Sequence, residues 1–454
     1  MPFRFGIVTL TAAPQAFVRA RIRLESGLEA TGASAELLAP KWFDKTPTLS
    51  NEDNFEQLRA ALRLSSQAYL EGSARTAFGH FEAHHLSHIK RSADVGLNVL
   101  TANFGPALID RALMDALCRA MGISFYDAMR RNLGGLCASP LADDLKGFDF
   151  DALMSQLAPA PSIQARHTVG LVDLITAADR PAGQQAVGDG LPETLEEVVR
   201  RYAHRWFKLK VGGHLADDLE RLAAIAAVLD RSDEPYRVSL DGNEQYDDVD
   251  SIAALWEAMR HDRRLHRLSA SVAFIEQPIR RGNALTRSID LLARQAPVII
   301  DESDDTLDAF VRARALGYTG VSSKTCKGLW RSLINRARCE QWNREMGTPG
   351  RFFMSAEDLT IQAGLALQQD LALINLLGID HVERNGHHYV NGMADLPLGE
   401  QAAFLKAHPD LYEQSHGATR VRISEGQLAV ASLACEGYAS SAMPDWSSMR
   451  RIAH

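Results

Sequence analysis

Two lysines, Lys208 and Lys210, stand two residues apart in the otherwise apolar run from Trp206 to Val211. Side chains alternate along a strand, so both lysines would lie on one face of it. A lysine that faces a protein core is costly unless charged or reacting groups lie opposite. Two lysines on a strand are more often turned to solvent, so the residues that follow must decide between the two interpretations.

Three acids follow the next three apolar runs of the chain: Asp241, Glu276 and Asp301. Carboxylates that converge repel one another unless a cation lies between them. Oxygen ligands from separate strands, with positions left open, suit Mg²⁺. Each acid alone could cap the helix that follows it, but capping does not explain all three acids together with Lys208, Lys210 and the later Lys324. The pattern therefore favours a Mg²⁺ site flanked by lysines.

A lysine that acts as a base needs a depressed pKa, because an ordinary ammonium group stays protonated at neutral pH. Burial and a neighbouring cation both favour the neutral amine, and Lys208 could supply that cation to Lys210.

The elements that must position these residues alternate strictly between strand and helix. Apolar runs predict strands at 167–172, 207–211, 236–240, 272–275, 298–300, 320–323, 352–354 and 381–382. Helical patterns lie between them at 194–204, 216–229, 249–259, 285–295, 306–316, 330–346 and 359–377. This order predicts an α/β fold with a (β/α)8-type barrel that is modified to (β/α)7β-like, with its site at the C-terminal strand ends. Strands two and six of such a barrel face each other across its mouth, which would place Lys210 opposite Lys324.

An open doubly wound sheet is the rival architecture, because alternation alone does not prove closure. No Gly-x-Gly-x-x-Gly segment or P-loop follows any predicted strand, which weakens a nucleotide-binding version of that rival.

Four segments divide the chain. Residues 1–138 predict an N-terminal α+β capping domain, with strands at 3–10, 16–24 and 29–37 and helices from 54 to 129. Residues 139–161 predict a linker, residues 162–397 the barrel, and residues 398–454 a C-terminal segment that packs back on the barrel or the capping domain.

Composition and net charge limit the kinds of partner that the protein is expected to bind. The 454 residues carry a net charge of −8 with mixed signs, which argues against nucleic acid or an anionic membrane. Five scattered cysteines without Cys-x-x-Cys spacing predict reduced thiols in the cytoplasm. No apolar run reaches the ~20 residues of a membrane span. A small-molecule substrate and a homo-oligomer are expected.

The strand-end motifs resemble those of a known family. The segments 207–212, 240–243, 274–278, 300–303 and 323–324, together with the helical segment 109–135 that ends in Leu-Gly-Gly, are similar to the enolase superfamily. Within it they are most similar to the muconate lactonizing enzyme subgroup of the mandelate racemase/muconate lactonizing enzyme family. The resemblance implies Asp241, Glu276 and Asp301 as Mg²⁺ ligands.

The same resemblance implies Lys210 and Lys324 as an acid/base pair, with Lys208 tuning its neighbour and helping to hold the substrate. Enzymes of this kind use a lysine or histidine base with Mg²⁺. The implied activity is removal of the proton α to a substrate carboxylate through an enediolate, in a racemase or epimerase. A cycloisomerase or a dehydratase/lyase that works by β-elimination is the alternative. A mandelate-racemase-like subgroup would instead carry Asp and His on strands six and seven, whereas this chain has Lys324 and the histidine-free 352–355.

Other residues near the strand ends are weaker candidates for substrate or ligand contacts: Asn243, Glu302, Ser355, Glu357 and Glu383. The stretch 261–271 is interpreted as an insertion outside the site. The loop 11–15 is too short for a lid, which leaves 38–49 or 80–104 to close the pocket. The pairs at 84–85 and 387–388 are interpreted as surface histidines, and Trp330 and Trp342 as core or interface anchors.

Overall fold

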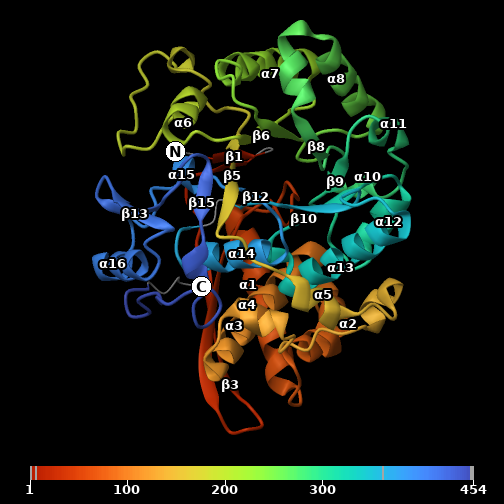
Figure 1. The fold of residues 1–454 in the computed structure, drawn as a ribbon, viewed down its shortest axis with the longest axis vertical. Coiled ribbons are helices and arrows are strands. Elements are labelled where there is room, and N and C mark those ends of the chain that lie inside the picture. Colours follow the sequence, from red (N-terminus) through yellow and green to blue (C-terminus); the bar gives the residue numbers. More distant parts are fainter. Residues whose placement is uncertain (1–2, 6–7, 360–361, 450–454) are drawn as a thin grey trace.

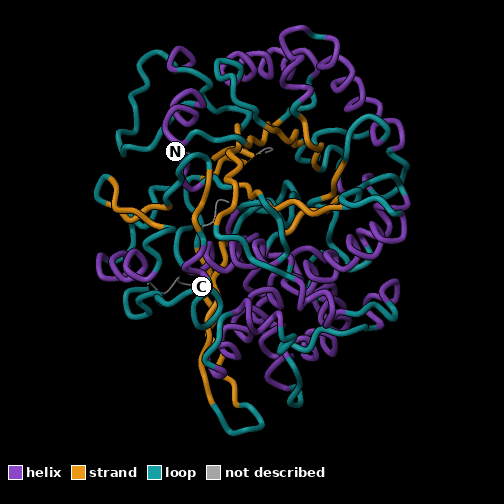
Figure 2. Tube along the Cα trace, in the orientation of Figure 1, coloured by secondary structure: helices purple, strands orange, loops and turns teal. Residues whose placement is uncertain are grey.

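The computed structural model describes residues 3–5, 8–359 and 362–449 of the chain. Figure 1 shows two bodies in contact, with the N-terminal helices α1 to α4 and strand β3 grouped below the barrel in that view. Strands run through the middle of the larger body and helices surround them (Figure 2).

Eight parallel strands form the centre of the larger body. They are β5 (Ser162–Val169), β6 (Trp206–Lys210), β7 (Arg237–Asp241), β8 (Val272–Glu276), β9 (Val298–Ile300), β10 (Gly320–Ser323), β11 (Phe353–Ala356) and β12 (His381–Glu383). Each strand pairs with the next in chain order, and β12 pairs in parallel with β5 through His381–Gln164, Val382–Ala165 and Glu383–Arg166. The sheet is therefore a closed barrel, as predicted, and the open-sheet alternative is wrong.

The strands fall where their apolar runs predict them, with small shifts at the ends. The largest shift is in β5, which begins at Ser162 instead of residue 167. Its first three residues, Ser162 to Gln164, pair antiparallel with β15 (Gln427–Ala429) of the C-terminal segment.

Helices of the barrel connect successive strands: α6 (Leu195–Tyr202), α7 (Leu215–Leu229), α8 (Val249–His261), α12 (Ala309–Ala315), α13 (Leu329–Met346) and α14 (Leu365–Leu376). Short 3₁₀ turns accompany them at η2 (Ala177–Asp179) and η4 (Thr325–Lys327). Local sequence explains the helix limits. Thr194 and Glu197 form a reciprocal capping box at the start of α6, and Gly347 ends α13 in the left-handed conformation at φ 62°.

The predicted helix 285–295 is replaced by two single turns, α10 (Arg281–Ala284) and α11 (Asp290–Ala293). The Thr286 hydroxyl donates to the Asn283 carbonyl, and the Asp290 amide donates to the Ser288 hydroxyl. Such local bonds give the backbone an alternative to the helical ladder, which is the physical reason for the break.

The stretch 261–271 folds as η3 (Arg263–Leu265) and α9 (His266–Ala270). It precedes β8, so it lies at the barrel end opposite the mouth. Arg264 fastens it to α7 through Glu220, at 2.8 Å.

The capping domain contains a long antiparallel hairpin, β3 (Gln15–Arg23) and β4 (Glu29–Leu37), packed on four helices. The helices are α1 (Asn51–Glu71), α2 (Ala77–Asp94), α3 (Val99–Met121) and α4 (Phe125–Arg130). A Cβ on Gly32 of β4 would lie 2.1 Å from the Ala116 nitrogen of α3, so the hairpin and helix touch backbone to backbone. The single strand predicted at 3–10 is wrong, because β1 (Phe3–Phe5) and β2 (Val8–Leu10) pair with each other and not with β3.

Residues 139–161, expected to be a linker, contain η1 (Pro140–Leu145) and α5 (Phe150–Gln156), whose Leu145 and Met154 are fully buried. The C-terminal segment includes α16 (Leu398–Ala407), β13 (Tyr412–Ser415), β14 (Ala418–Val421), β15 and η5 (Ala431–Leu433), after the short α15 (Gly386–Tyr389). It contacts the barrel through β15 and the capping domain through Tyr438, whose ring stacks on Phe125 at 3.7 Å between centroids.

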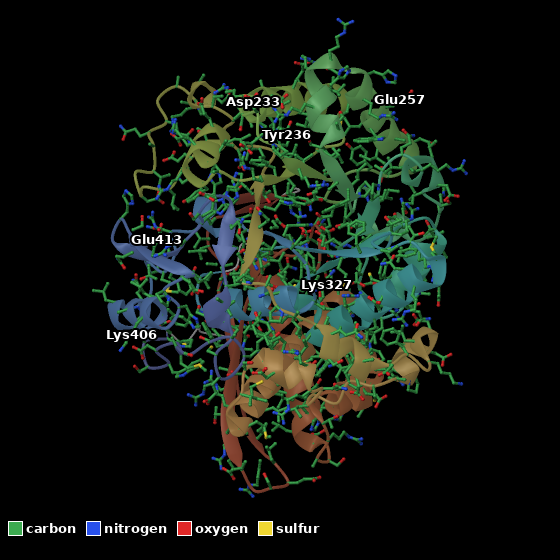
Figure 3. The ribbon with its side chains drawn as sticks, viewed as in Figure 1. Asp233, Tyr236, Glu257, Lys327, Lys406 and Glu413 are labelled. Carbon is green, nitrogen blue, oxygen red and sulfur yellow. The ribbon has the colours of Figure 1, made fainter. Side chains whose placement is uncertain are left out.

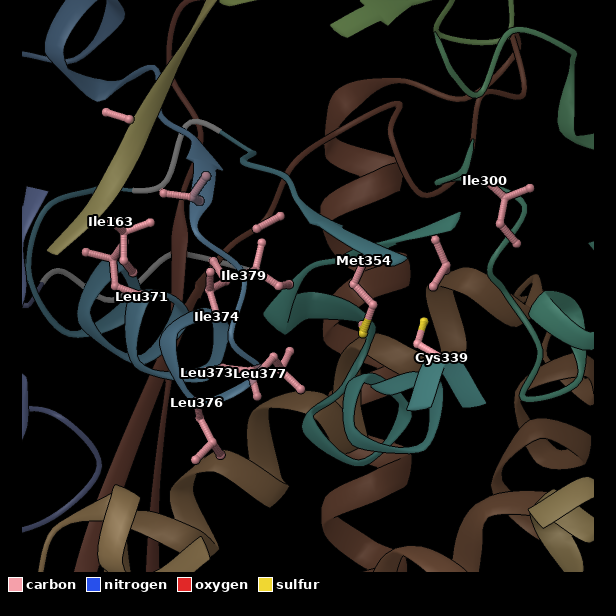
Figure 4. Packing of buried hydrophobic residues seen from close by; sticks show 14 of the residues in the cluster. Ile163, Ile300, Cys339, Met354, Leu371, Leu373, Ile374, Leu376, Leu377 and Ile379 are labelled. Atoms are coloured by element: carbon pink, nitrogen blue, oxygen red, sulfur yellow. The ribbon is translucent and has the colours of Figure 1, made fainter. Parts of the chain in front are cut away.

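Apolar side chains fill the space between the barrel and its helices, including Met354 of β11, Cys339 of α13 and Leu371 of α14 (Figure 4). Trp330 and Trp342 are buried in this core as predicted, and Trp330 packs edge-on against Phe78 of the capping domain. Among the described helices, none is long and apolar enough to cross a membrane.

Candidate active site

Six side chains singled out by the sequence meet at one end of the barrel, and none is more than 6% exposed. They are Lys208, Lys210, Asp241, Glu276, Asp301 and Lys324. Strand register places them at one level, because Lys210 pairs with Asp241 and Asp241 with Glu276 across neighbouring strands. Asp301 directly follows β9 and Lys324 directly follows β10.

Asp241 joins the two lysines of β6. Its Oδ2 lies 2.9 Å from Lys208 Nζ and 2.5 Å from Lys210 Nζ. Burial alone would raise the pKa of Asp241, but the charges of Lys208 and Lys210 outweigh it and lower the pKa. Lys208 and Lys210 therefore share the inward face of β6 with a carboxylate between them.

Lys208 is the central cation of the mouth. Besides Asp241, its Nζ donates to Glu276 at 2.9 Å, Glu357 at 2.7 Å and Glu383 at 3.0 Å. Burial would lower the pKa of Lys208, but the four carboxylates together raise it well above its ordinary value. Lys208 is thus an ammonium ion that holds four acids, which is a larger role than tuning Lys210.

Asp301 is held from the other side. Lys324 Nζ donates to its Oδ2 at 2.7 Å, Lys327 Nζ approaches Oδ1 at 3.4 Å, and the Ser322 hydroxyl also donates to Oδ1. Burial opposes ionisation, but the charges of Lys324 and Lys327 lower the pKa of Asp301 strongly. Figure 3 places Lys327 in the middle of the molecule, whereas the labelled Asp233, Glu257 and Lys406 lie towards its edge.

Glu276 is the least satisfied of the three acids. Burial, followed by the charges of Asp241 and Glu357, raises its pKa well above the ordinary value. Its Oε2 is buried and finds no hydrogen-bond partner among the described residues. A buried carboxylate oxygen with a spare lone pair is a group that further positive charge would stabilise.

Arg166 of β5 organises the far side of the mouth. Its guanidinium donates to the Ser355 hydroxyl at 3.0 Å, to the Ala356 carbonyl at 2.8 Å and to Glu357. Ser355 also donates to Glu357 at 2.6 Å. Ser355 and Glu357 therefore belong to the polar network beneath the mouth.

Glu383 at the end of β12 accepts hydrogen bonds from Thr168 at 2.5 Å and Asn385 at 2.9 Å. Burial would raise its pKa, but the charges of Lys208, Lys210 and Lys324 lower it well below the ordinary value. Glu383 is thus a charged acid that joins the last barrel strand to the lysines.

Asn243 and Glu302 form the rim on the opposite side. The Asn243 backbone amide donates to Asp241 Oδ1 at 2.8 Å, and its side-chain amide lies 3.4 Å from Glu302. Asn243 has a positive φ of 41°, which Asn tolerates better than most residues. Burial raises the pKa of Glu302.

Residues 38–49 of the capping domain cover this mouth. The Trp42 ring lies 4.3 Å from Lys324 Nζ, in cation–π geometry. Lys45 pairs with Glu244 and reaches Glu302 at 3.7 Å. Arg281 ties the segment down by donating to the Trp42 carbonyl at 3.0 Å and to Glu244 at 2.8 Å.

The pocket that remains is small, with a volume of about 20 Å³. Its lining comprises Leu10, Ala39, Trp42, Lys208, Lys210, Asn243, Lys324, Asp358, Leu359 and Glu383. Lys210 and Lys324 therefore border one space. A larger hollow of about 950 Å³ lies around Arg336, Glu340 and Asp380, which precede β11 and β12 at the opposite end of the barrel, away from the lysines.

The two segments considered for a lid have different positions. Residues Ala39 and Trp42 line the pocket, whereas Asn98, from the stretch 80–104, supports the covering segment from behind by donating to the Phe43 carbonyl at 3.1 Å. Leu10, next to the short loop 11–15, contributes one apolar side chain to the lining.

The interpretation of the histidine pairs as surface residues is wrong for all but His84, which is half-buried. His85, His387 and His388 are buried, at 7%, 6% and 1% exposure. The His85 side chain faces the interior from α2. The two histidine side chains of α15 are covered by other parts of the chain. Adjacent histidines need not lie on a surface when a short helix is enclosed by later chain.

Sequence reasoning missed several residues of the site: Trp42, Lys45, Arg166, Thr168, Glu244, Arg281 and Lys327. Arg166 could have been found by starting β5 earlier, since alternation then turns positions 166 and 168 to the same face. Trp42 and Lys45 carry no strand-end signal, because they reach the mouth from another domain.

Comparison with known proteins supports the architecture. Residues 190–400 match the family described as enolase C-terminal domain-like. No curated protein is similar enough in sequence to count as a match.

Several solved structures share the fold over almost the whole chain. An isomerase from Streptomyces coelicolor A3(2) has a TM-score of 0.55 at 16% identity, covering 95% of this chain and 89% of that one. The muconate lactonizing enzyme from Pseudomonas putida has a TM-score of 0.53 at 16% identity, covering 95% and 92%. The muconate lactonizing enzyme from Mycobacterium smegmatis, complexed with muconolactone, has a TM-score of 0.54 at 18% identity, covering 98% and 93%. At these identities the likeness is one of fold.

The closed parallel barrel, its capping domain and the matched region define a barrel enzyme of the isomerase or lyase kind. Residues 190–400 belong to the enolase C-terminal domain-like family.

Proposed function

We propose that the protein removes the proton α to the carboxylate of a small-molecule substrate, with Mg²⁺ as cofactor, and returns it as a racemase or epimerase. The observation that carries this proposal is that Lys210 and Lys324 border one pocket. They come from β6 and from the end of β10, which are four strands apart in a ring of eight and so face each other across the mouth.

The three acids fit a hard divalent cation. Asp241, Glu276 and Asp301 offer only oxygen atoms, from three successive strands and at one level of the barrel. Glu276 Oε2 finds no partner within the described part of the chain, so a ligand atom is available there. Asp241, Glu276 and Asp301 would hold the ion.

When bound there, Mg²⁺ would bind the substrate carboxylate, stabilise the enediolate charge and weaken the pull of Asp241 and Asp301 on the lysines. Lys210, as the neutral amine, then takes the α-proton from one face. Lys324 delivers a proton to the other face, and the exchange of roles allows the reverse reaction. Lys208 stays charged because four carboxylates surround it, so it orients the acids and the substrate.

Trp42 and its neighbours exclude water from the reacting carbon. The pocket volume of about 20 Å³ is room for about one water molecule. Entry of a substrate with several carbon atoms therefore requires the segment 38–49 to open, and its anchors Lys45 and Arg281 are the bonds that break.

The test is deuterium exchange. The protein with Mg²⁺ is incubated in D₂O with a library of α-substituted carboxylates of both configurations, and α-deuterium is measured by mass spectrometry. Wild-type protein should exchange at least one compound, and EDTA should abolish the exchange. Lys210→Ala and Lys324→Ala should each lower exchange by about 10²- to 10⁴-fold, each first from a different stereoisomer.

Lys406→Ala is the matched control, because Lys406 is exposed on α16. It should exchange like wild type. Full exchange in both pocket variants would rule out the two lysines as the acid/base pair.

A cycloisomerase or a lyase that eliminates a β-group is the second candidate. One observation favours it: Asp301 outweighs the effect of burial and raises the pKa of Lys324, and the Trp42 ring adds a further cation–π contact. A Lys324 that remains an ammonium would stabilise charge, with Lys210 as the single base. In the exchange experiment, that chemistry labels only one stereoisomer.

A cytoplasmic location and a homo-oligomeric state complete the proposal. The five cysteines, all within the described residues, form no disulfide, as expected for a reducing compartment. Closed homo-oligomers are the most common assemblies of soluble enzymes.

A further inference from the structure

Three buried histidines gather on the outer face of the barrel, away from the lysines. They are His167 of β5, His204 just before β6 and His387 of α15, and one ring nitrogen from each lies within 4.8 Å of the others. Arg166 and Thr168 contact the acids inside the mouth, so alternation turns His167 outward. The cluster therefore lies behind the wall of the site.

Some ring nitrogens of the three histidines have no hydrogen-bond partner among the described residues. His204 Nδ1 lies 2.8 Å from the Ala165 carbonyl, which accepts and so requires a proton on Nδ1. His204 Nε2 then carries a lone pair, and it is buried without a partner in the residues that the structure describes. His167 Nδ1 and His387 Nε2 face each other at 3.0 Å and can share one proton, while His387 Nδ1 is likewise unpaired within that part of the chain.

We propose that His167, His204 and His387 bind a transition-metal ion of the Zn²⁺ class, at a second site that is separate from the carboxylate site at the mouth.

Nitrogen ligands decide the kind of metal. Imidazole suits Zn²⁺, Cu²⁺, Ni²⁺ or Co²⁺, whereas Mg²⁺ prefers oxygen. The Ala165 carbonyl that accepts from His204 is the type of second partner that orients histidines bound to zinc. Burial lowers the pKa of His204 to about 4 and those of His167 and His387 well below their ordinary values, so the rings are neutral and ready to bind at neutral pH.

The geometry needs only a small adjustment. Tetrahedral zinc with ligands at about 2.0–2.1 Å separates its ligand nitrogens by about 3.3–3.4 Å. Here the ligand nitrogens all lie within 4.8 Å of one another, and His167 Nδ1 and His387 Nε2 are 3.0 Å apart. His388 is not a fourth ligand, because its Nδ1 bonds the Pro192 carbonyl at 2.8 Å and its Nε2 points towards Asp173. Three histidines leave one position of the metal open to water.

Such an ion would link three adjacent strands. His387 follows β12, His167 lies on β5 and His204 precedes β6, which are neighbours where the barrel closes. The next residues on the inner side, Arg166 and Thr168, hold Glu357 and Glu383. The ion would therefore fix the wall from which these two acids are supported.

Co²⁺ titration tests this site. Wild-type protein stripped with EDTA and desalted is titrated with Co²⁺ in the presence of excess Mg²⁺, which occupies the carboxylate site. We expect one equivalent of Co²⁺ with the visible absorption bands of a four-coordinate nitrogen site, displaced by Zn²⁺ and not by Mg²⁺. No stoichiometric binding by wild-type protein would overturn the proposal, whether or not any variant folds.

Variants locate the ion. His204→Gln and His387→Gln should each weaken Co²⁺ binding at least tenfold, with circular dichroism showing that the fold is kept. His381→Gln is the matched control, because His381 is equally buried but stacks on Trp206 outside the cluster. Glu276→Gln should leave Co²⁺ binding unchanged. Binding that survives both histidine variants, or that Glu276→Gln removes, would show that the ion lies elsewhere.

Discussion

Adjacent residues of β5 belong to two buried polar regions that differ in charge. Arg166 and Thr168 face a mouth where five basic and several acidic side chains form ion pairs, with Lys208 touching four carboxylates. His167 faces outward into a cluster of imidazoles that burial keeps neutral. Both regions are equally removed from water.

The difference shows what burial does to a titratable group. At the mouth, attraction to the lysines exceeds the desolvation cost for Asp241, Asp301 and Glu383, which stay charged. Burial prevails for Glu276 and Glu302, whose pKa values are raised.

Where opposite charges do not converge, as in the histidine cluster and the capping helices, the neutral form is favoured. Asp110 of α3 is such a group, because burial raises its pKa to about 8 and its contact is the Tyr69 hydroxyl at 2.8 Å.

Removing the central cation should have the largest effect. Lys208→Met leaves four buried carboxylates without their shared partner, and breaking a buried pair of this kind costs about 3–5 kcal/mol. Urea denaturation at pH 7 without Mg²⁺ should show a loss of free energy of unfolding of that size. Lys406→Met, at an exposed position, should change it by less than about 0.5 kcal/mol. A loss below about 1 kcal/mol for Lys208→Met would mean that the mouth does not depend on charge pairing.

Asp110→Asn should produce a smaller change that depends on pH. The folded-state pKa of about 8 lies above the unfolded value of about 3.9. Between these values the unfolded chain has lost the proton that the folded chain keeps, so the wild type loses stability as pH rises. Asparagine retains an acceptor for Tyr69 and cannot ionise. The stability gap in favour of the variant should therefore grow by about 2 kcal/mol from pH 4 to pH 6.

Asp94→Asn, at an exposed position near the end of α2, is the control and should show no such growth. A gap that stays constant with pH would mean that Asp110 is ionised in the folded protein, as Asp241 and Asp301 are at the mouth.

His85→Leu should give the smallest effect, with the opposite dependence on pH. Burial lowers the pKa of His85 to about 3, below its unfolded value of about 6.5. Below pH 6.5 His85 binds a proton in the unfolded chain but not in the folded protein, so the wild type loses stability as pH falls. At pH 7.5 the two proteins should differ by less than about 1 kcal/mol, and at pH 5.5 the wild type should have lost about 1 kcal/mol more.

The same substitution at the exposed His266 should leave the acid sensitivity unchanged. Parallel curves for wild type and His85→Leu would show that a cation can be buried in the capping domain without a partner.

The sequence predicts the barrel well because each strand is a short apolar run followed by a polar residue. Eight such runs favour a closed barrel, and the pairing of β12 with β5 establishes the closure. The acids and lysines of the mouth are found for the same reason, since Asp241, Glu276, Asp301 and Lys324 stand at the ends of those runs. Local pattern is sufficient where the clustered side chains stand at strand ends.

Local pattern fails where a side chain reaches the site from elsewhere. Trp42 and Lys45 belong to another domain, and their relation to Lys324 and Glu302 exists only after docking. The histidine cluster is invisible for a similar reason, because His167, His204 and His387 come together through the pairing of β12 with β5 and of β5 with β6. The prediction of a helix at 285–295 is wrong for a different reason. Hydrogen bonds of the Thr286 and Ser288 hydroxyls replace the helical ladder there.

The pairing of β12 with β5 also sets the order in which the chain can fold. Gln164 pairs with His381 and Ile163 with Leu428, so two of the three partner strands of β5, β12 and β15, emerge from the ribosome long after it. Contacts this far apart in sequence make folding slow, and an unpaired strand edge invites wrong partners until they form. β5 is thus the first barrel strand to be synthesised and the last to be completed, and a nascent chain that stops before residue 381 cannot close the ring.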